Sequence, residues 1–502
     1  MIDALLIRAD ASPQIGTGHV MRCIALAQAW NERGGDVMFL LAKTTPSISE
    51  LLRHEGFGVR TTDAEPGSPA DAAATVACAR ELSTRFVVAD SYRFADEYQQ
   101  ALKAADLRVL LLDDYGHARH YSADLVLNQN FMPDSRLYSH REPGTNLLLG
   151  NKYTLLRREF RVLKNQERKF LESDRKVLVT LGGSDPDNAT AKVIEALGLL
   201  ANIDAMVVVG GSSPHRQELE LLVARQQISG QSIRLVANVR NMPELMSWAD
   251  LAVVAGGSTV WELACLGVPA IILVIAENQR QNAKLLSESG SFLNLGEHRL
   301  VDAPQIANAI GSLLASSEKR QAMSALGRIM VDGKGAARVC ERFLAGPISL
   351  RRAKAEDCRR FWEWANDPVV RAVSFHSEPI PWEIHDRWFA NKLQDPKAQL
   401  WIGLNAWNQP FGQVRFEIRE GDRAEICTSV DAAHRKAGFG TALIRQAVAA
   451  LFATTKVSVV EARIKMDNVA SIRAFEKAGF CAAQSMTVTG TEAIVFLRSR
   501  DP

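Results

Sequence analysis

The sequence contains no pair of cysteines in the C-x-x-C spacing, although it has seven cysteines. They lie far apart and mostly within apolar patterns, so neither a cysteine-based zinc site nor a thioredoxin-like redox site is expected. An odd and scattered set of this kind is typical of buried free thiols in a reducing compartment. We therefore predict free cysteines and no bound metal.

Long apolar runs are also missing. No uninterrupted stretch approaches the ~20 residues that a membrane-spanning helix needs. The chain opens on a strand pattern that contains acidic residues, whereas a secretion signal has a positively charged start and an apolar core. These absences predict a soluble cytoplasmic protein without membrane insertion.

An excess of charge of one sign is absent as well. The chain has 59 lysines and arginines against 57 aspartates and glutamates, a formal net charge of +2, and the cations form no stripe. This balance argues against nucleic acid as a partner. Hydrophobic residues make up an ordinary 47% of the 502 residues, which is enough for two to four domains with their own cores.

Short apolar runs alternate with amphipathic stretches from residue 3 to about residue 127. Runs such as "RFVVAD" and "RVLLLDD" end in polar residues, and the rhythm restarts at residue 176 with "KVLVTLGG". Such alternation predicts βαβ units and parallel sheets that bind ligands at the carboxyl ends of their strands. We expect two doubly wound Rossmann-like lobes, 1–155 and 156–345, with a hinge near 150–170.

The rhythm breaks at about residue 346. The stretch "LWIGLNAWNQPFGQVRFEIREGDRAEICTSV" is typical of antiparallel strands joined by turns, and helical and strand patterns follow it. The predicted third unit, residues 348–500, is therefore of the α+β class. The whole chain is predicted to be α/β, with two doubly wound lobes followed by this smaller domain.

The stretch "IGTGHVMRC" places His19 at the first turn of a predicted helix, behind two glycines. The positive end of the helix disfavours a charged imidazolium, so a neutral ring is expected there. Gly16 and Gly18 lack a Cβ and would let the backbone approach a ligand closely. A histidine that makes only local hydrogen bonds at a helix start explains the same pattern.

The stretch "VVAGGSTVWELACLGVPAII" places Gly256 and Gly257 between a predicted strand and a helix. Ser258 would cap that helix, where unpaired N–H groups and the positive helix end suit a phosphate. Glu262 lies one turn further on, where its carboxylate could accept hydrogen bonds from both ribose hydroxyls. A capped helix with a solvated glutamate is the alternative. Residues 181–190, "LGGSDPDNAT", form a second such turn, and the two together predict a nucleotide-sugar site.

Residues 1–345 resemble the UDP-sugar hydrolases of pseudaminic acid biosynthesis, relatives of the MurG-type glycosyltransferases with the GT-B fold. The resemblance rests on "RADAS", "IGTGHVMRC", "ADSY", "LLDD", "DLVLNQN", "GGSDPDN", "AGGSTVWELACLGVPAI" and "ENQ". It implies hydrolysis of UDP-2,4-diacetamido-2,4,6-trideoxy-β-L-altropyranose to UDP and the free sugar. Spacing alone does not separate a hydrolase from a transferase.

The same resemblance implies roles for individual residues. His19 would be the general base that activates water for attack on the anomeric carbon. Tyr92 would line the sugar pocket, and Asn278 would bind the substrate. Further residues could belong to the cleft or only cap and close local turns. These undecided residues are Asp10, Asp90, Asp113, Ser91 and Gln279.

The stretch "HRKAGFGTALIRQAV" fits the pattern R-x-x-G-x-G through Arg435, Gly438 and Gly440. Consecutive backbone N–H groups in such a turn form a nest for a pyrophosphate. Together with "NVASIRAFEKAGF", which begins at Asn468, this motif resembles the GNAT acetyltransferases over about 348–498. The resemblance implies that these residues bind acetyl-CoA as co-substrate.

The GNAT resemblance further implies that the backbone around Ser429 and Val430 binds the pantetheine and polarises the thioester carbonyl. Many GNAT enzymes carry a tyrosine seven residues after the motif asparagine, as the acid for the departing thiolate. Phe475 occupies that place here and cannot donate a proton. The base is open between Glu417 and Glu425, and either could instead be a solvated strand residue.

The two resemblances together imply consecutive reactions. Acetyl-CoA would acetylate N4 of UDP-4-amino-4,6-dideoxy-N-acetyl-β-L-altrosamine, and the lobes would then remove UDP from the product, so that each domain predicts the substrate of the other. Two other interpretations stay open. One is the same pair of activities on a legionaminic-type or other 4-amino-sugar nucleotide. The other is a nucleotide-sugar binding protein whose acetyltransferase domain has lost catalysis.

Overall fold

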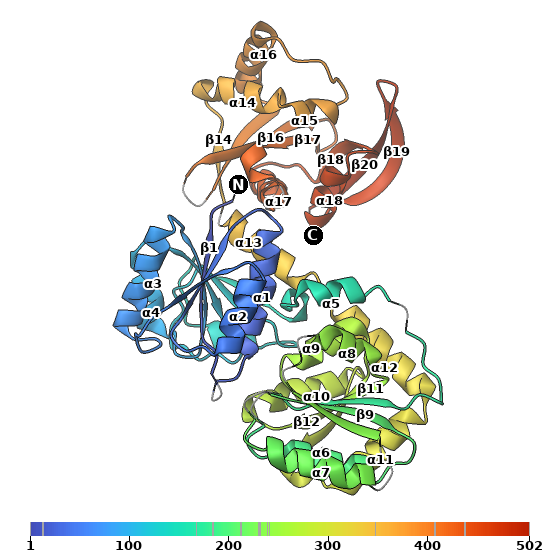
Figure 1. The fold of residues 1–502 in the computed structure, drawn as a ribbon. Coiled ribbons are helices and arrows are strands. Elements are labelled where there is room, and N and C mark those ends of the chain that lie inside the picture. The colour runs from blue at the N-terminus through green and yellow to red at the C-terminus, as the bar shows by residue number, and fades with distance from the viewer. Residues whose placement is uncertain are drawn as a thin grey trace. The chain divides into compact units, whose positions relative to one another are not determined.

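The computed structural model divides the chain into two compact units, Met1–Cys340 and Glu341–Pro502 (Figure 1). The first unit holds two parallel sheets and the second holds one mixed sheet. The structure describes residues 2–500 apart from residues 13–14, 167, 183–184, 211–212, 229–231, 238, 240, 347, 406–407 and 436–437.

The first lobe is a parallel sheet between two layers of helices. Its elements are β1 (Leu5–Ala9), α1 (Gly18–Asn31), β2 (Val37–Leu41), α2 (Pro46–His54), β3 (Gly58–Thr61), α3 (Pro69–Glu81), β4 (Phe86–Asp90), α4 (Asp96–Ala104), β5 (Arg108–Leu112), β6 (Leu125–Asn128), η1 (Ser135–Tyr138), β7 (Asn146–Leu149) and η2 (Asn151–Tyr153). The strand order is β3-β2-β1-β4-β5-β6-β7. Strands β1, β4 and β5 are buried throughout because α3 and α4 cover one face and α1 the other.

The second lobe repeats this plan. Its elements are α5 (Arg158–Leu163), β8 (Lys176–Thr180), α6 (Ala189–Gly198), β9 (Asp204–Val209), α7 (Arg216–Ile228), β10 (Ser232–Ala237), α8 (Met242–Trp248), β11 (Leu251–Ala255), α9 (Thr259–Leu266), β12 (Ala270–Val274), η3 (Glu277–Gln279), α10 (Arg280–Glu288), β13 (Leu293–Glu297), η4 (His298–Leu300), α11 (Ala303–Leu314) and α12 (Ser317–Met330). The next helix, α13 (Gly335–Ala345), returns to the first lobe, where Arg33 donates to the carbonyl of Ala337 at 3.1 Å. The strand order is β10-β9-β8-β11-β12-β13. Helices α6, α7 and α11 bury one face of the sheet, and α8, α9 and α10 bury the other.

Each parallel sheet has one point where the strand order reverses. In the first lobe this point lies between β1 and β4, and in the second it lies between β8 and β11. Loops at the carboxyl ends of such strand pairs splay apart and form the usual ligand site of doubly wound folds. The predicted glycine turns after β1 and β11 lie at these points. The third predicted turn follows β8, and its residues Gly183 and Ser184 lie outside the described residues.

The second unit is a mixed sheet. Its elements are β14 (Ser349–Arg352), η5 (Ala355–Asp357), α14 (Cys358–Ala365), α15 (Pro368–Ala372), α16 (Trp382–Gln394), β15 (Ala398–Leu404), β16 (Pro410–Arg419), β17 (Arg423–Val430), η6 (Ala432–His434), α17 (Phe439–Thr454), β18 (Val459–Lys465), α18 (Val469–Lys477), β19 (Cys481–Val488) and β20 (Thr491–Ser499). The strand order is β14-β15-β16-β17-β18-β20-β19. Every pair is antiparallel except β17 with β18. Helices α14 and α16 pack on one face, and α17 packs on the other.

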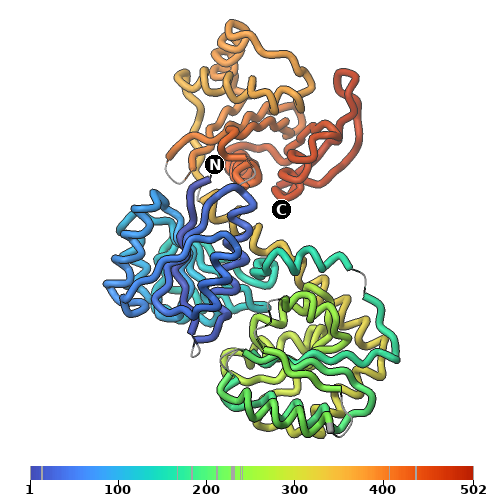
Figure 2. Tube along the Cα trace, in the orientation of Figure 1, coloured from blue at the N-terminus to red at the C-terminus, as the bar shows by residue number. Residues whose placement is uncertain are grey.

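The predicted fold class is confirmed, since two doubly wound parallel sheets precede an α+β domain. Figure 2 shows the chain completing the first sheet before it enters the second. The predicted bounds 1–155, 156–345 and 348–500 stay predictions, and α13 spans the division between the two units. All seven cysteines are free, but Cys427 is half-buried and Cys481 is exposed, in contrast to the burial predicted for them. No helix of the described residues is long and apolar enough to cross a membrane.

We expect the two units to fold independently, because each has its own sheet and its own buried clusters. Residues 1–346 and 349–502, expressed separately, should each give a cooperative thermal transition and the circular dichroism of its own helices and strands. A piece that shows no cooperative transition would contradict this independence.

Candidate functional site

His19 and Asp90 meet where the first sheet reverses its strand order. His19 is the second residue of α1 and Asp90 the last residue of β4, and Nδ1 of His19 lies 2.6 Å from Oδ1 of Asp90. Arg22 donates to both oxygens of Asp90, at 2.6 and 2.7 Å. Burial alone would raise the pKa of Asp90, but the Arg22 guanidinium and His19 lower it well below its ordinary value.

An ionised Asp90 determines which nitrogen of His19 carries the proton. The carboxylate accepts a hydrogen bond from Nδ1–H, so the lone pair of the neutral ring lies on Nε2. In the described part of the chain, no residue forms a hydrogen bond with Nε2. A buried carboxylate orients the imidazole of Ser-His-Asp triads in the same way. The structure thus places Asp90, which the sequence left undecided, in the site.

Arg22 joins this pair to a second carboxylate. Its Nη1 lies 2.8 and 2.9 Å from the oxygens of Asp114, and the hydroxyl of Tyr92 donates to Asp114 at 2.6 Å. The ring of Tyr92 packs edge-on against His19, with 5.0 Å between ring centroids. Tyr92 therefore lies beside the predicted base, held there by the network of two carboxylates and one guanidinium.

The other undecided residues of the first lobe close local turns. One oxygen of Asp10 accepts two backbone N–H groups after β2, at 2.7 and 2.8 Å. Asp113 accepts backbone N–H groups of the loop that follows it, together with the hydroxyl of Tyr121. Ser91 accepts the backbone N–H of Arg93 at 3.2 Å. These contacts occupy Asp113 and Ser91 without a ligand, whereas the second oxygen of Asp10 is buried with no hydrogen-bond partner among the described residues.

The glycines before His19 leave free space. Gly16 has a φ of +80°, which disfavours any side chain. A Cβ added at Gly16 or at Gly18 would meet no atom of the described chain within 4 Å. This open surface next to the base agrees with the predicted close approach of a ligand.

The glycine turn of the second lobe differs in part from the prediction. The side-chain oxygen of Gln279 accepts the N–H groups of Gly256 and Ile275, both at 3.2 Å, so the N–H of Gly256 is not free for a phosphate. Ser258 stands at the N-cap of α9 but makes no capping hydrogen bond. The reason is its helical φ of −61° and ψ of −22°, whereas capping needs an extended backbone. Asn278 is exposed beside Gln279 in η3.

Glu262 lies in the first turn of α9 and is partly buried. Burial raises its pKa to about 7, and the charge of Arg157 offsets only part of this rise. No described residue forms a hydrogen bond with the carboxyl group. Arg157 is only 8% exposed, and its Nε–H has no partner among the described residues. A buried guanidinium and a partly buried carboxyl group, both with unused hydrogen-bonding capacity among the described residues, suit a polar ligand.

In the second unit, strands β17 and β18 separate. They pair only from Arg423 and Val459 to Glu425 and Glu461, while β17 continues to Val430. On its other side, β17 stays paired with β16 over its whole length. An opening therefore lies between β17 and β18 beyond their last paired residues.

The backbone of β17 alternates between β16 and this opening. Asp431 donates its N–H to the carbonyl of Phe411 in a 2.8 Å bond. By alternation, the backbone groups of Ser429 point to β16 and those of Val430 point to the opening. The hydroxyl of Ser429 also accepts from the Gln413 amide at 3.0 Å. Of the two predicted backbone positions, only Val430 therefore faces the opening.

The predicted glycine turn beyond β17 contains a residue with a positive φ. Gly438 has a φ of +83° and caps α17, and a Cβ on Gly440 would lie 3.6 Å from Val430. The Arg435 guanidinium donates to the carbonyl of Val430 at 2.9 Å and pairs with Asp367 at 2.9 Å. It thus ties the turn to the strand. Residues Lys436 and Ala437 of this motif lie outside the described part of the chain.

Two further residues of the acetyltransferase motifs have structural contacts. The side-chain oxygen of Asn468 caps α18 by accepting the N–H of Ser471 at 3.1 Å. Phe475 is buried and packs edge-on against Phe480, with 5.0 Å between centroids. Both residues therefore stabilise α18 and its surroundings.

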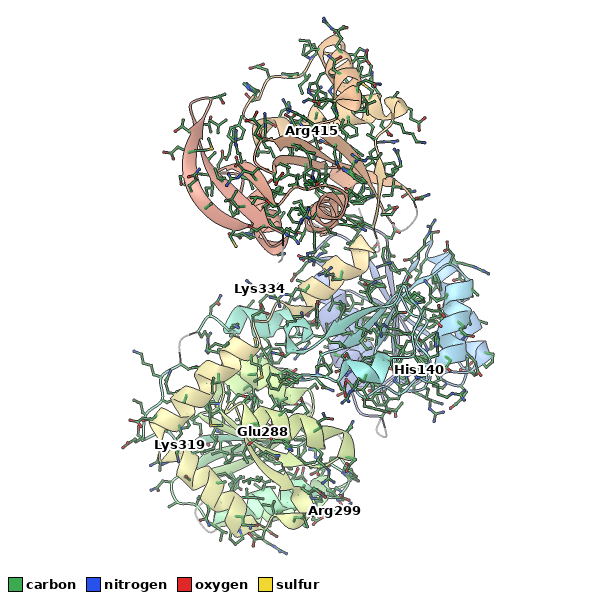
Figure 3. The ribbon with its side chains drawn as sticks, turned by 180° about the vertical axis from the view of Figure 1, so that it is seen from behind. His140, Glu288, Arg299, Lys319, Lys334 and Arg415 are labelled. Atoms are coloured by element: carbon green, nitrogen blue, oxygen red, sulfur yellow. The ribbon has the colours of Figure 1, made fainter. Side chains whose placement is uncertain are left out.

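The candidate bases Glu417 and Glu425 lie directly opposite one another on β16 and β17. Arg419 donates to both, at 3.5 and 3.1 Å. Arg415, which Figure 3 shows on this sheet, lies 3.5 Å from Glu417, and Arg463 lies 3.9 Å from Glu425. Each carboxylate is engaged in ion pairs, so a role as base requires these partners to be exchanged for the substrate amine.

Two stretches of the chain match family models. Residues 177–334 match the glycosyltransferase family 28 C-terminal domain, and residues 348–481 match the acetyltransferase (GNAT) domain. The chain is a fusion of these two domain types. One part of the chain is thus related to nucleotide-sugar enzymes and the other to acetyltransferases.

Several curated relatives align with this chain over most of their own length. An uncharacterised protein of Methanocaldococcus jannaschii is 24% identical over 95% of this chain and 96% of its own. The spore coat polysaccharide biosynthesis protein SpsG of Bacillus subtilis is 28% identical over 66% of this chain and 95% of its own length. The UDP-2,4-diacetamido-2,4,6-trideoxy-β-L-altropyranose hydrolase of Campylobacter jejuni is 22% identical over 57% of this chain and 97% of its own length.

Two solved structures are similar to parts of the chain. MurG of Acinetobacter baumannii has a TM-score of 0.45 and 16% identity, over 67% of this chain and 98% of its own. The aminoglycoside acetyltransferase AAC(6')-Ib with coenzyme A has a TM-score of 0.28 and 20% identity, over 31% of this chain and 95% of its own.

Three residues of the nucleotide-sugar region were missed by the sequence analysis. Arg22 stands one helical turn after His19, and Asp114 is the second aspartate of "LLDD", so both lay within quoted motifs. Arg157 lies in the predicted hinge, where no periodicity or turn residue marks it. Its significance appears only from its burial near Glu262.

The desolvation of Glu262 predicts a pH-dependent stability. Its pKa rises from 4.5 to about 7 on folding, so the contribution is fully present below pH 4.5 and is lost as the pH rises through 7. Glu262→Gln cannot ionise and should be more stable relative to the native chain at pH 8 than at pH 5, by up to about 3 kcal/mol. Urea unfolding at both pH values measures this difference. Glu195→Gln, an exposed site in the same lobe, is the control, and an equal response of both variants would contradict the prediction.

Proposed function

We propose that the first unit hydrolyses UDP-2,4-diacetamido-2,4,6-trideoxy-β-L-altropyranose to UDP and the free sugar. The observation that carries this proposal is the pair of His19 with an ionised, buried Asp90 at the reversal point of a parallel sheet. The printed activity of the Campylobacter jejuni relative supports the choice of substrate. The chemistry needed is one proton transfer from water and one C–O bond cleavage.

His19 supplies the proton transfer. Its Nε2 takes a proton from water as the water oxygen attacks the anomeric carbon, and the bond from that carbon to the UDP oxygen breaks. The proton then leaves the imidazolium for solvent. Asp90 stabilises the transient imidazolium, and Arg22 keeps Asp90 ionised in its buried position. Tyr92 borders the same space through its contact with His19.

In the second lobe, UDP is held by Glu262 and Arg157, whose carboxyl group and Nε–H form no hydrogen bond within the described part of the chain. Glu262 accepts hydrogen bonds from the two ribose hydroxyls, and the free Nε–H of Arg157 donates to the same nucleotide. The N–H groups beyond Gly256 at the start of α9 approach the diphosphate. UDP leaves as a dianionic or trianionic group whose charge these donors stabilise.

For the second unit, we propose N4-acetylation of the preceding UDP-4-amino sugar by acetyl-CoA. The opening between β17 and β18 takes the pantetheine, and the turn at Gly438 takes the pyrophosphate. Coenzyme A in the similar AAC(6')-Ib structure supports this co-substrate. The amine attacks the thioester carbonyl, and the C–S bond breaks to release coenzyme A. Arg415, Arg419 and Arg463 on this sheet suit an acceptor that carries a diphosphate.

The decisive experiment combines both steps. The full chain is incubated with the UDP-4-amino sugar and acetyl-CoA, and the products are followed by NMR. The proposal requires an N-acetyl signal first and a free reducing sugar with UDP afterwards. Release of a different 4-amino sugar in a parallel incubation with its UDP form would reassign the substrate.

His19→Asn and Asp90→Asn should each lower the rate of UDP release by ~10²-fold or more, the usual scale for loss of a general base or its orientation. Calorimetry should show unchanged UDP affinity in both variants, because UDP binds the second lobe. His140→Asn alters an exposed histidine of the same lobe (Figure 3) and should keep the native rate. Near-native UDP release by His19→Asn would remove His19 from the mechanism.

Gly438→Val should abolish acetyl-CoA binding and leave UDP release intact. At a φ of +83°, a β-branched residue is strained, and its Cβ would lie only 3.2 to 3.3 Å from Glu341 of α13, so the turn proposed to bind the pyrophosphate would have to shift. Gly490→Val introduces similar strain at a φ of +78° in the hairpin between β19 and β20, and it should keep the affinity for acetyl-CoA. Calorimetry with acetyl-CoA compares the two variants, and equal losses would refute the assignment of the turn.

A further inference from the structure

Tyr115 is an exposed aromatic residue next to the proposed active site. Its side chain is 45% exposed, and its ring centroid lies 4.9 Å from that of Tyr92. The ring of Tyr92 in turn lies 5.0 Å from that of His19. A continuous row of three rings therefore leads from the proposed base to a ring that faces solvent.

The loop that carries Tyr115 is held in place. The backbone N–H groups of Tyr115 and Gly116 both donate to one oxygen of Asp113 at 2.8 Å, and the hydroxyl of Tyr121 donates to the other. Burial would raise the pKa of Asp113, but hydrogen bonds from His117 and Tyr121 lower it to about 2. Asp113 thus stays ionised and keeps its acceptors available to the loop.

The next residue of the loop is fixed as well. Asn128 and Asn130 donate their side-chain amides to the backbone carbonyl of Asp114, at 3.1 and 2.9 Å. The carboxylate of Asp114 binds Arg22 and Tyr92. Hydrogen bonds therefore fix the backbone on both sides of Tyr115 in the sequence. Preorganised binding groups are held in this way.

Part of the ring of Tyr115 is packed and part is left exposed. It contacts the rings of Tyr92 and His117, with centroid distances of 4.9 and 6.2 Å, but it is not part of the buried cluster that joins α3 and α4 to the first sheet, whereas Tyr98, Tyr121 and Tyr138 are. Its exposed part would gain further free energy if a ligand covered it. The C–H groups of a pyranose and its methyl substituents offer such a cover, and polar hydroxyl groups do not.

We propose that Tyr115 is the platform on which the hexose of the nucleotide sugar stacks, and that it selects sugars with 6-deoxy and N-acetyl groups over fully hydroxylated ones. This inference rests on the proposed hydrolysis of a UDP-sugar in the first unit. It assigns the sugar to the ring row of His19, Tyr92 and Tyr115, and leaves the nucleotide to Glu262 and Arg157. Tyr115 contributes to substrate positioning and specificity.

The test measures sugar and nucleotide binding separately in the full chain. The substitution His19→Asn prevents turnover, and calorimetry gives the dissociation constants of UDP and of UDP-2,4-diacetamido-2,4,6-trideoxy-β-L-altropyranose. Adding Tyr115→Ala should weaken the UDP-sugar about tenfold and leave UDP unchanged, whereas Tyr115→Phe should keep both within about twofold. Leu137→Ala is the control, because Leu137 is 42% exposed and borders Gly116; it should also keep both values.

With His19 intact, Tyr115→Ala should lower kcat/KM about tenfold, mainly through KM. It should also reduce the preference for this sugar nucleotide over UDP-glucose, whose hexose is fully hydroxylated, in binding. Equal weakening of UDP and UDP-sugar, an unchanged UDP-sugar affinity, or an equal effect of Leu137→Ala would each overturn the assignment. If the native chain binds the UDP-sugar in a Tyr115-dependent manner but releases no UDP, the proposed hydrolysis fails while the platform stands.

Discussion

The ion pair between Asp90 and Arg22 is the constraint on which the proposed active site of the first lobe depends. Asp90 has no solvent exposure, and an unpaired carboxylate in that position would be neutralised or would destabilise the fold by several kcal/mol. Arg22 compensates its charge, and the compensated carboxylate then orients His19. Through its other nitrogen, Arg22 also holds Asp114, to which Tyr92 is bonded. Buried pairs of this kind add little net stability but impose one geometry.

The two lobes use opposite electrostatics for their carboxylates. In the first lobe, Asp90 is kept ionised by a guanidinium in direct contact. In the second, Glu262 has no such contact, and burial raises its pKa to about 7. The first arrangement suits a group that must hold a base in one orientation throughout a reaction. The second suits a group whose partners arrive with the ligand, since ribose hydroxyls would supply the missing hydrogen bonds.

In the second unit, the proposed acetyl-CoA site lies where two neighbouring strands separate. Pairing of β17 with β18 ends at Glu425 and Glu461, so the part of β17 that follows is not hydrogen-bonded to β18, and the proposed co-substrate would lie along it. The cluster of Glu417, Glu425 and the arginines around them occupies the same sheet. The charges nearly balance there, and an acceptor with both an amine and a diphosphate matches such a surface better than a simple polycation does.

The sequence alone determined the elements and their order, because strands, helices and glycine turns follow from local periodicity and backbone preference. It therefore located His19, the turns at Gly16 and Gly438, and the carboxyl ends of the strands. Tertiary structure decided which side chains meet. Asp90 reaches His19 across 71 positions, and Gln279 reaches Gly256 across 23, because the sheets place β4 beside β1 and β12 beside β11. Local patterns carry no information on such pairings. The burial of Arg157 and the exposure of Tyr115 likewise depend on packing against distant segments.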